Sequence, residues 1–461
     1  MKMNRHSLLS AAASLVLVGL AACSSSSTPK AAAPDPVALK AAQAANSGNY
    51  TRTIFLGDSL TAGYQSNSLI DSSQVNGWAP LFAKQAGTPI VLPLIAPPGA
   101  PNQLTLEHLA NPPVLGQLPG VTIGRDDPNV QPTDLAVPGF LVNDVLNTRP
   151  ELIPSPGQQQ ITQLVLGYPA FMNNKVRTAA QAAVDANATT IFLWIGNNDA
   201  LNADFTGTTA GLTPLATFTT QYQQLIAYLQ ANSPAHLVLL NIPDVTLVAY
   251  LQPAAKILAQ YSAATGVPVA NLSALLGIQA GDFLNQTGLA QIGPILKGAQ
   301  KGPISDAGVL SAAEAATVRA QVTAYNQVIA AQATAAGATL VDINTLFNFA
   351  AAKGVVYNGI PGTTAFLGGV FSLDGIHPTN TGYAIIANYV IDTLNANYAS
   401  IAGYKAVPDV NIAAIAAVDP LYPPYPGHKG VITPGQQLVM PVVPQLSAER
   451  MQALLGEGAQ R

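Results

Sequence analysis

Two short stretches of the sequence carry residues whose types and spacing suit nucleophilic catalysis. Ser59 lies in the sequence GDSL, directly after the apolar run 53–57, where a buried strand should end and a helix should begin. A serine at that place is either a helix N-cap or a hydroxyl nucleophile presented on a turn. Near the other end of the chain, Asp374 precedes His377 by three residues, close enough for a carboxylate to orient an imidazole and stabilise its cation.

Two further blocks contain groups that can donate hydrogen bonds to a developing oxyanion. In the sequence DLAVPG, a strand is expected to stop at Gly139, whose N–H can point into a crevice. In the sequence GNND, which follows another apolar run, Asn198 can donate a side-chain N–H. Each block alone is weak evidence, because glycine and asparagine are frequent in turns.

The elements that must position these blocks follow from the apolar runs. Five β-branched-rich runs without clean alternation predict strands covered on both faces, at 53–57, 135–137, 189–196, 236–243 and 339–343. Helical patterns lie between them, at 174–186, 215–232, 311–336 and 382–395. We therefore predict an α/β fold, a flavodoxin-like three-layer α/β/α sandwich with a five-stranded parallel sheet. All four blocks then fall at the carboxyl ends of strands, where parallel sheets bind ligands.

The main domain is predicted to span residues 51–403. Two long segments interrupted by Gly and Pro, 67–132 and 251–310, are interpreted as insertions near the site. Residues 404–461 form a Pro-rich C-terminal extension that packs along the core or stays extended, with a short amphipathic stretch at 447–455.

The N-terminus has the pattern of an export signal. A short basic region precedes the apolar stretch 8–20, which is too short for a comfortable membrane span. The sequence LAAC that follows resembles a bacterial lipoprotein box, which implies that Cys23 becomes the lipid-modified first mature residue; the alternative is an ordinary cleavage site. Residues 24–50 are predicted to form a flexible tether. Ser24, by analogy with enterobacterial lipoproteins, favours outer-membrane sorting.

Composition excludes several classes of function. Charged residues make up only 9% of the chain, and the net charge is −4 without a basic cluster, so nucleic acid is not an expected partner. Cys23 is the single cysteine, which excludes an intramolecular disulfide and a thiolate metal site. No histidine cluster indicates a metal site either.

The order and combination of the four blocks resemble the SGNH (GDSL) hydrolase superfamily. That resemblance implies Ser59 as nucleophile, His377 as general base and Asp374 as the carboxylate that orients it. It also implies an oxyanion hole formed by the Ser59 N–H, the Gly139 N–H and the Asn198 side chain, with no cofactor. The glycine block departs from the family at Asp134, where an asparagine is usual, which puts the local hydrogen bonding in question.

Other residues in or near the blocks are expected to have structural roles. Four belong to the motifs and should hold loops rather than contact substrate: Gly57, Asp58, Gly196 and Asp199. The remaining histidines of the mature chain, His108, His236 and His428, lack a carboxylate at a similar spacing and are expected to be surface or structural residues. Trp194 should pack in the core, whereas Trp78 is either a packing residue or a substrate contact.

The sequence therefore predicts an exported, lipid-anchored serine ester hydrolase of the cell envelope, at the outer membrane or periplasmic face. Its expected substrate is an acyl ester, with a lipid among the candidates, and the two insertions are expected to form walls that favour a medium or long acyl chain. Two alternatives stay open. One is a carbohydrate O-deacetylase or acyltransferase on the same scaffold, and the other is a catalytically silent surface-binding lipoprotein.

Overall fold

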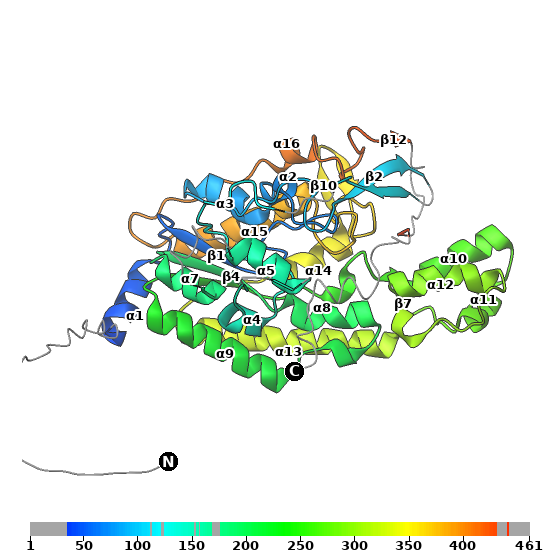
Figure 1. Cartoon of the computed structure of the whole chain (residues 1–461), viewed down its shortest axis with the longest axis horizontal. Coiled ribbons are helices and arrows are strands. Elements are labelled where there is room, and N and C mark those ends of the chain that lie inside the picture. Colours follow the sequence, from blue (N-terminus) through cyan, green and yellow to red (C-terminus); the bar gives the residue numbers. More distant parts are fainter. Residues whose placement is uncertain are drawn as a thin grey trace, which may run out of the picture.

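A parallel sheet of four strands forms the centre of the fold (Figure 1). The strands lie in the order β1 (Thr53–Gly57), β4 (Thr190–Trp194), β5 (His236–Leu240) and β9 (Thr339–Val341). Every residue of β1, β4 and β5 is buried, which explains why these runs are apolar without alternation. The computed structural model describes residues 35–110, 113–120, 124–151, 154–155, 157–167, 176–430 and 440–441.

The predicted fifth strand is not a regular strand of this sheet. Residues 133–137 run beside β1, where the Phe55 N–H donates to the Thr133 carbonyl at 2.9 Å and the Leu135 N–H donates to the Phe55 carbonyl at 2.8 Å. A single parallel bridge joins the two segments. The segment is too short for a longer ladder because a proline and then Gly139, at a φ of 85°, turn the chain away. It still brings Gly139 to the carboxyl end of β1.

Helices cover both faces of the sheet (Figure 1). One layer contains α7 (Ala179–Asp185), α9 (Leu215–Asn232) and α13 (Ala312–Ala336), and the other contains α3 (Trp78–Ala86) and α15 (Asn380–Tyr398), with α14 (Ile343–Lys353) beside it. The helices predicted at 215–232, 311–336 and 382–395 are confirmed within a few residues. The shorter helices of the described main domain are α2 (Asp71–Gln74), α4 (Val142–Asn147), α5 (Gln158–Leu166) and α8 (Asn197–Thr206).

The predicted insertion at 67–132 begins too early, because α3 belongs to the core. Trp78 on α3 is fully buried and lies edge-on against Phe55, at 5.6 Å between ring centroids, and against Trp194, at 6.1 Å. Trp78 is therefore a packing residue and not a substrate contact. Further along the same segment, β2 (Leu104–Leu109) pairs with β3 (Val114–Gln117) and with β12 (Lys429–Gly430) in a small separate sheet.

The segment 251–310 has secondary structure of its own. Its helices project from one end of the molecule (Figure 1), and its three short strands form another small sheet. The elements are β6 (Gln252–Pro253), α10 (Ala254–Thr265), α11 (Val269–Leu276), β7 (Phe283–Leu284), α12 (Gln286–Leu296) and β8 (Val309–Leu310). That this lobe is an insertion into a shared core stays a prediction.

The C-terminal extension packs along the core as far as it is described. The short helix α16 (Ile412–Ala416) lies on α15. Just beyond it, one carboxylate oxygen of Asp419 accepts hydrogen bonds from the backbone N–H and the hydroxyl of Thr381, both at 2.7 Å, at the start of α15. The amphipathic stretch predicted at 447–455 lies outside the described residues.

The predicted flexible tether at 24–50 is wrong for its second half. Residues 36–45 form helix α1 (Pro36–Ala45), which packs against α9 and β5. The Gln43 amide donates to the backbone carbonyls of Gln230, at 2.8 Å, and Ser233, at 2.9 Å. The N-cap side chain of Asp35 and a run of alanines explain why a helix forms here. The predicted signal and Cys23 lie outside the described residues.

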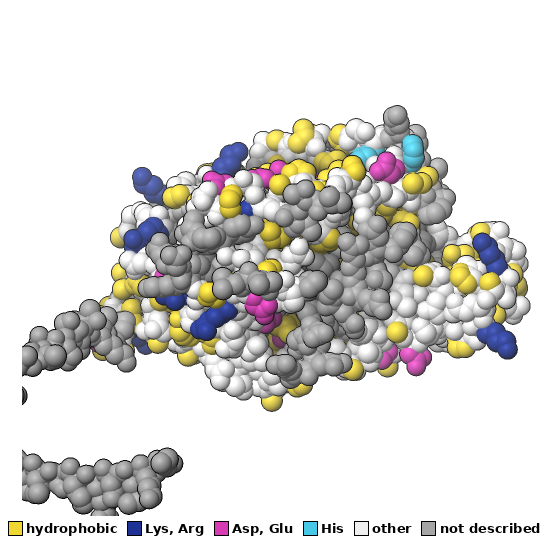
Figure 2. All heavy atoms as spheres, viewed as in Figure 1, with side chains coloured by type: hydrophobic (Ala, Val, Ile, Leu, Met, Phe, Trp, Pro, Cys, Tyr) yellow, Lys and Arg dark blue, Asp and Glu magenta, His cyan; other side chains and the backbone are white. Residues whose placement is uncertain are grey.

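The surface has few charges, as the composition requires. On the face in Figure 2, charged side chains are scattered among hydrophobic and neutral polar ones. Within the part of the chain that the structure describes, no helix is both long and apolar enough to cross a bilayer.

Candidate active site

The turn after β1 presents Ser59 at the carboxyl edge of the sheet. Gly57 ends the strand where a Cβ would lie 2.5 Å from the Trp194 carbonyl oxygen, so only glycine fits. The Ala62 N–H then donates to the Asp58 carbonyl at 3.0 Å, which closes one helical turn. The helix expected at this point does not continue, because Gly63 adopts a φ of 74°.

A hydrogen-bonded chain joins the two stretches that suggested catalysis. The Ser59 Oγ lies 2.8 Å from Nε2 of His377, and Nδ1 of the same imidazole lies 3.0 Å from Oδ2 of Asp374. Ser59 and His377 are each only 8% exposed, although 318 residues separate them in sequence. A carboxylate, an imidazole and a hydroxyl in this order can activate the hydroxyl oxygen as a nucleophile.

Asp374 is held as a buried anion. Its Oδ1 accepts the N–H groups of Ile376, at 2.8 Å, and His377, at 2.9 Å, while Oδ2 also accepts the N–H of Asn67 at 2.7 Å. Burial by itself would raise the pKa of this carboxyl. The neighbouring imidazole and the backbone donors outweigh that effect and hold the pKa of Asp374 below its ordinary value.

The loop that carries His377 is fixed from two sides. Gly375 has a φ of 74°, and a Cβ there would lie 2.8 Å from the backbone nitrogen of Tyr250. The Tyr250 N–H donates to the Gly375 carbonyl at 2.8 Å. After the histidine, Thr379 caps α15 by accepting the Gly382 N–H at 3.0 Å. These contacts hold the imidazole of His377 next to Ser59.

The glycine block and the asparagine block, which contain the expected oxyanion donors, contact each other. Asn198 lies in the first turn of α8, and its Nδ2 donates to the Phe140 carbonyl at 3.0 Å. A side-chain amide carries two N–H hydrogens, so this bond orients the group and leaves the second hydrogen for a ligand. The bond also connects Asn198 to the turn at Gly139.

Asp58 connects the serine turn to the asparagine turn. Its Oδ1 accepts the Leu60 N–H at 3.1 Å, and its Oδ2 accepts Nδ2 of Asn197 at 2.8 Å. Burial raises the pKa of Asp58 to about 6, although both hydrogen bonds oppose that shift. These contacts link the two turns, and the loop-holding role of Asp58 stays a prediction. Asn197 was not singled out from the sequence, because nothing distinguished it from its neighbour in the GNND block.

Asp199 and Gly196 brace the other side of the asparagine turn. The carboxylate of Asp199 accepts the Val142 N–H at 3.1 Å and the Thr213 hydroxyl at 2.8 Å, and burial raises its pKa to about 7. Gly196 has a φ of 111°, where a Cβ would come within 2.9 Å of Ile242 Cδ1. Both residues lie against backbone and core groups, and their role in holding the loop stays a prediction.

The departure at Asp134 leaves the local hydrogen bond intact. Its Oδ1 accepts the Ala136 N–H at 3.1 Å, which the oxygen of an asparagine would do equally well. Burial raises the pKa of Asp134 to about 8. The carboxyl is therefore largely protonated at neutral pH and resembles the neutral amide that is usual there.

The other histidines lie away from Ser59. His236 is buried at the amino-terminal end of β5, the opposite edge of the sheet, with Ser47 and Thr339 hydroxyls at its two ring nitrogens. His108 lies exposed on β2, and His428 lies in the C-terminal extension. Among the described residues, no group of three or more His, Cys, Asp or Glu side chains could hold a metal ion.

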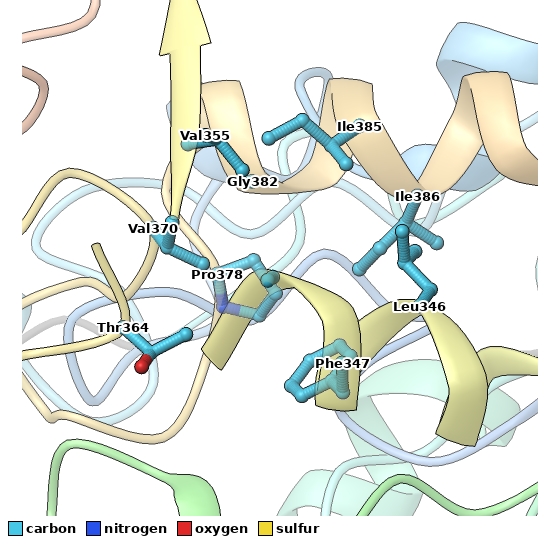
Figure 3. A pocket seen from close by; sticks show the side chains of 10 residues that line it. Leu346, Phe347, Val355, Thr364, Val370, Pro378, Gly382, Ile385 and Ile386 are labelled. Atoms are coloured by element: carbon cyan, nitrogen blue, oxygen red, sulfur yellow. The ribbon is translucent and has the colours of Figure 1, made fainter. Parts of the chain in front are cut away.

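An apolar hollow lies next to the histidine loop but does not include the site (Figure 3). It opens between α14, α15 and β10 (Val355–Tyr357), and Pro378 forms part of its wall. Ser59, Asp374 and His377 are not among its lining residues, which are Leu346, Phe347, Ala350, Val355, Thr364, Val370, Pro378, Gly382, Ile385 and Ile386.

The family model for GDSL-like lipases/acylhydrolases matches residues 54–390. The chain belongs to this family and is a carboxylic ester hydrolase. None of the curated proteins compared with the chain matches it.

Several solved structures of esterases and lipases are similar to this chain. An extracellular lipase from Streptomyces rimosus has 16% identity and a TM-score of 0.33, covering 75% of this chain and 99% of its own. A phospholipase A1 from Streptomyces albidoflavus has 14% identity and a TM-score of 0.31, with 75% and 98% covered. A catalytic mutant of an acetylxylan esterase from Geobacillus stearothermophilus has 10% identity and a TM-score of 0.35, with 78% and 96% covered.

The raised pKa of Asp134 predicts a measurable effect on stability. A carboxyl with a higher pKa in the folded state stabilises the fold at low pH, and that contribution is lost as the pH rises from about 4 to about 8. Asp134→Asn cannot ionise, so its free energy of unfolding should exceed the wild-type value at pH 8 by about 1–3 kcal/mol and match it more closely at pH 4. Urea unfolding at both pH values measures this.

Asp127 is exposed and lies in the loop before Asp134. Asp127→Asn also removes one carboxylate and is therefore the matched control. It should change stability little at either pH. An Asp134→Asn variant that loses stability equally at pH 4 and pH 8 would contradict a buried, protonated Asp134.

Proposed function

We propose that the chain is an exported, lipid-anchored serine esterase that works through an acyl-enzyme on Ser59. The observation that carries the proposal is the continuous chain of hydrogen bonds from Ser59 Oγ through His377 to the buried carboxylate of Asp374. Its three members come from two distant parts of the sequence and meet at the carboxyl edge of the sheet, in the order that nucleophile activation requires.

The geometry suggests how each group acts in hydrolysis. Ser59 Oγ attacks the ester carbonyl carbon while Nε2 of His377 takes its proton. Collapse of the tetrahedral intermediate breaks the bond to the alcohol oxygen, which leaves with that proton, and the acyl group stays on Oγ. Water then attacks the acyl-enzyme, with His377 again accepting a proton, and the carboxylic acid departs. Asp374 remains ionised throughout and stabilises the imidazolium.

Three donors are proposed to stabilise the oxyanion. They are the backbone N–H groups of Ser59 and Gly139 and the Nδ2 group of Asn198. The hydrogen bond from Asn198 to the Phe140 carbonyl supports this assignment, because it holds the amide beside the Gly139 turn before any substrate arrives.

Variants of these residues should differ in the size of the lost activity. Ser59→Ala and His377→Ala should each lower kcat on a chromogenic acyl ester by about 10⁶, since removing either disables the nucleophile. Asp374→Ala should cost about 10⁴, because a poorly oriented imidazole can still act as base. Asn198→Ala should cost about 10²–10³, because two oxyanion donors remain.

Asn202→Ala, on the same helix as Asn198, is the matched control and should keep its activity. Circular dichroism must show that every variant is folded. Full activity in a folded Asn198→Ala enzyme would contradict the assignment of the Asn198 amide to the oxyanion hole. Wild-type turnover in Ser59→Ala would overturn the proposed mechanism.

The substrate is proposed to be an ester with a medium or long acyl chain. Each buried methylene adds about 0.8 kcal/mol of binding, so even a shallow apolar groove should produce a rise in kcat/KM with acyl length. A series of p-nitrophenyl esters from acetate to laurate, together with acetylated sugars, measures this. A kcat/KM that peaks at acetate and extends to acetylated sugars would favour a carbohydrate deacetylase instead.

The lipid anchor is proposed from the sequence LAAC ending at Cys23. Cys23→Ser should leave the precursor unprocessed or move the protein out of the membrane fraction, since no modified cysteine would carry acyl chains. Cell fractionation and sensitivity of processing to globomycin measure this. Wild-type protein found wholly in the soluble fraction would contradict the anchor.

A further inference from the structure

The residues that follow the serine turn wrap around the histidine loop. We call residues 64–67 the clamp segment. The Gln65 amide donates to the Pro378 carbonyl and to Oδ1 of Asn380, both at 3.1 Å, and the Ser66 N–H donates to Ser372 Oγ at 2.9 Å. The clamp segment thus joins the nucleophile turn to the loop that carries the base, on both sides of His377.

The backbone of the clamp segment is held in an unusual conformation. Ser66 and Asn67 have φ values of 51° and 61°, in the left-handed region that residues other than glycine seldom occupy. Such conformations persist only where surrounding contacts enforce them, and they gather at functional sites. One of those contacts is the Asn67 N–H, which donates to Oδ2 of Asp374 at 2.7 Å.

Tyr64 begins the clamp segment and places its ring against the imidazole. The ring centroids of Tyr64 and His377 are 4.6 Å apart, with a tilt of 50° between the planes. The tyrosine is only 4% exposed. Its backbone is fixed at both ends, because its N–H donates to the Ser59 carbonyl at 3.1 Å and its carbonyl accepts the Tyr383 hydroxyl at 2.7 Å.

We propose that Tyr64 is a positioning residue that stabilises the imidazolium form of His377 through its aromatic ring. The inference rests on the proposed function, in which His377 gains a proton at Nε2 as the bond from Ser59 Oγ to the substrate carbon forms. A cation within about 6 Å of an aromatic centroid is attracted by the ring, more strongly in a desolvated site. Tyr64 itself exchanges no proton in the reaction.

Two charged groups face the His377 imidazole, and substitutions at Tyr64 change neither of them. They are Asp374 on the same loop, which bonds to Nδ1, and Asp58 on the nucleophile turn, whose charge also acts on His377. A change in the titration of His377 that depends on the aromatic character of residue 64 therefore reports the ring.

NMR titration of the histidine ring protons tests the proposal without using turnover. Tyr64→Phe keeps the ring and should leave the pKa of His377 unchanged, whereas Tyr64→Leu should lower it by about 0.4–1.5 units. His377→Gln assigns the signal. The His236 signal, from the opposite edge of the sheet, is the internal control and should not move.

Kinetics give a second readout on the same variants. Tyr64→Leu should lower kcat by about 2- to 30-fold with little change in KM, and should move the acidic limb of the pH profile to lower pH. Tyr64→Phe should resemble the wild type. If Tyr64→Leu does not fold, fluorinated phenylalanines at position 64 keep the shape and weaken the ring face, and the pKa of His377 should fall with each added fluorine.

Two results would overturn the inference. One is a folded Tyr64→Leu protein, or a fluorinated series, in which His377 titrates as in the wild type. The other is a Tyr64→Phe protein that shifts as much as Tyr64→Leu, which would assign the effect to the hydroxyl and its contact with Asn67. Failure of the proposed function would show separately as wild-type turnover in Ser59→Ala.

Discussion

The site depends on one buried anion. Asp374 has almost no contact with solvent, and it keeps its charge because the His377 imidazole and backbone N–H groups from two segments surround it. A carboxylate buried without such partners would take up a proton. The charge in turn fixes which imidazole nitrogen faces Ser59. The clamp segment and the histidine loop meet at this carboxylate, and His377 connects it to Ser59, so the fold must bring two distant parts of the chain together before the site exists.

Three other buried aspartates lack a hydrogen bond to an imidazole. Asp58, Asp199 and Asp134 belong to the GDSL, GNND and DLAVPG blocks, and burial raises their pKa values to about 6, 7 and 8. Each accepts hydrogen bonds that hold a turn, but none is bonded to an imidazole. At these three aspartates burial outweighs the hydrogen bonds and raises the pKa, whereas at Asp374 the imidazole and the backbone donors outweigh burial and lower it.

Structure was predictable from the sequence where a residue's environment is set by its neighbours along the chain. The apolar strands and long helices were predictable from their patterns, and the resemblance of the four blocks predicted a triad of Ser59, His377 and Asp374, whose side chains lie within hydrogen-bonding distance of one another in the order expected. Contacts between distant segments were not predictable. They make α3 a core helix, fix α1 on the sheet instead of in a tether, and place Tyr64 on His377, although Tyr64 stands only five residues after Ser59.

The most direct measurement of the central claim is covalent labelling of Ser59. A fluorophosphonate reacts with a serine oxygen only when that oxygen is activated: an O–P bond forms, fluoride leaves, and the stable adduct is tetrahedral at phosphorus, like the tetrahedral intermediate of ester hydrolysis. Intact-mass and peptide mass spectrometry should show one label per wild-type chain, located on Ser59, and none on Ser59→Ala, with much slower labelling of His377→Ala. A protein that hydrolyses esters yet carries its label elsewhere, or labels equally well without Ser59, would contradict the assignment.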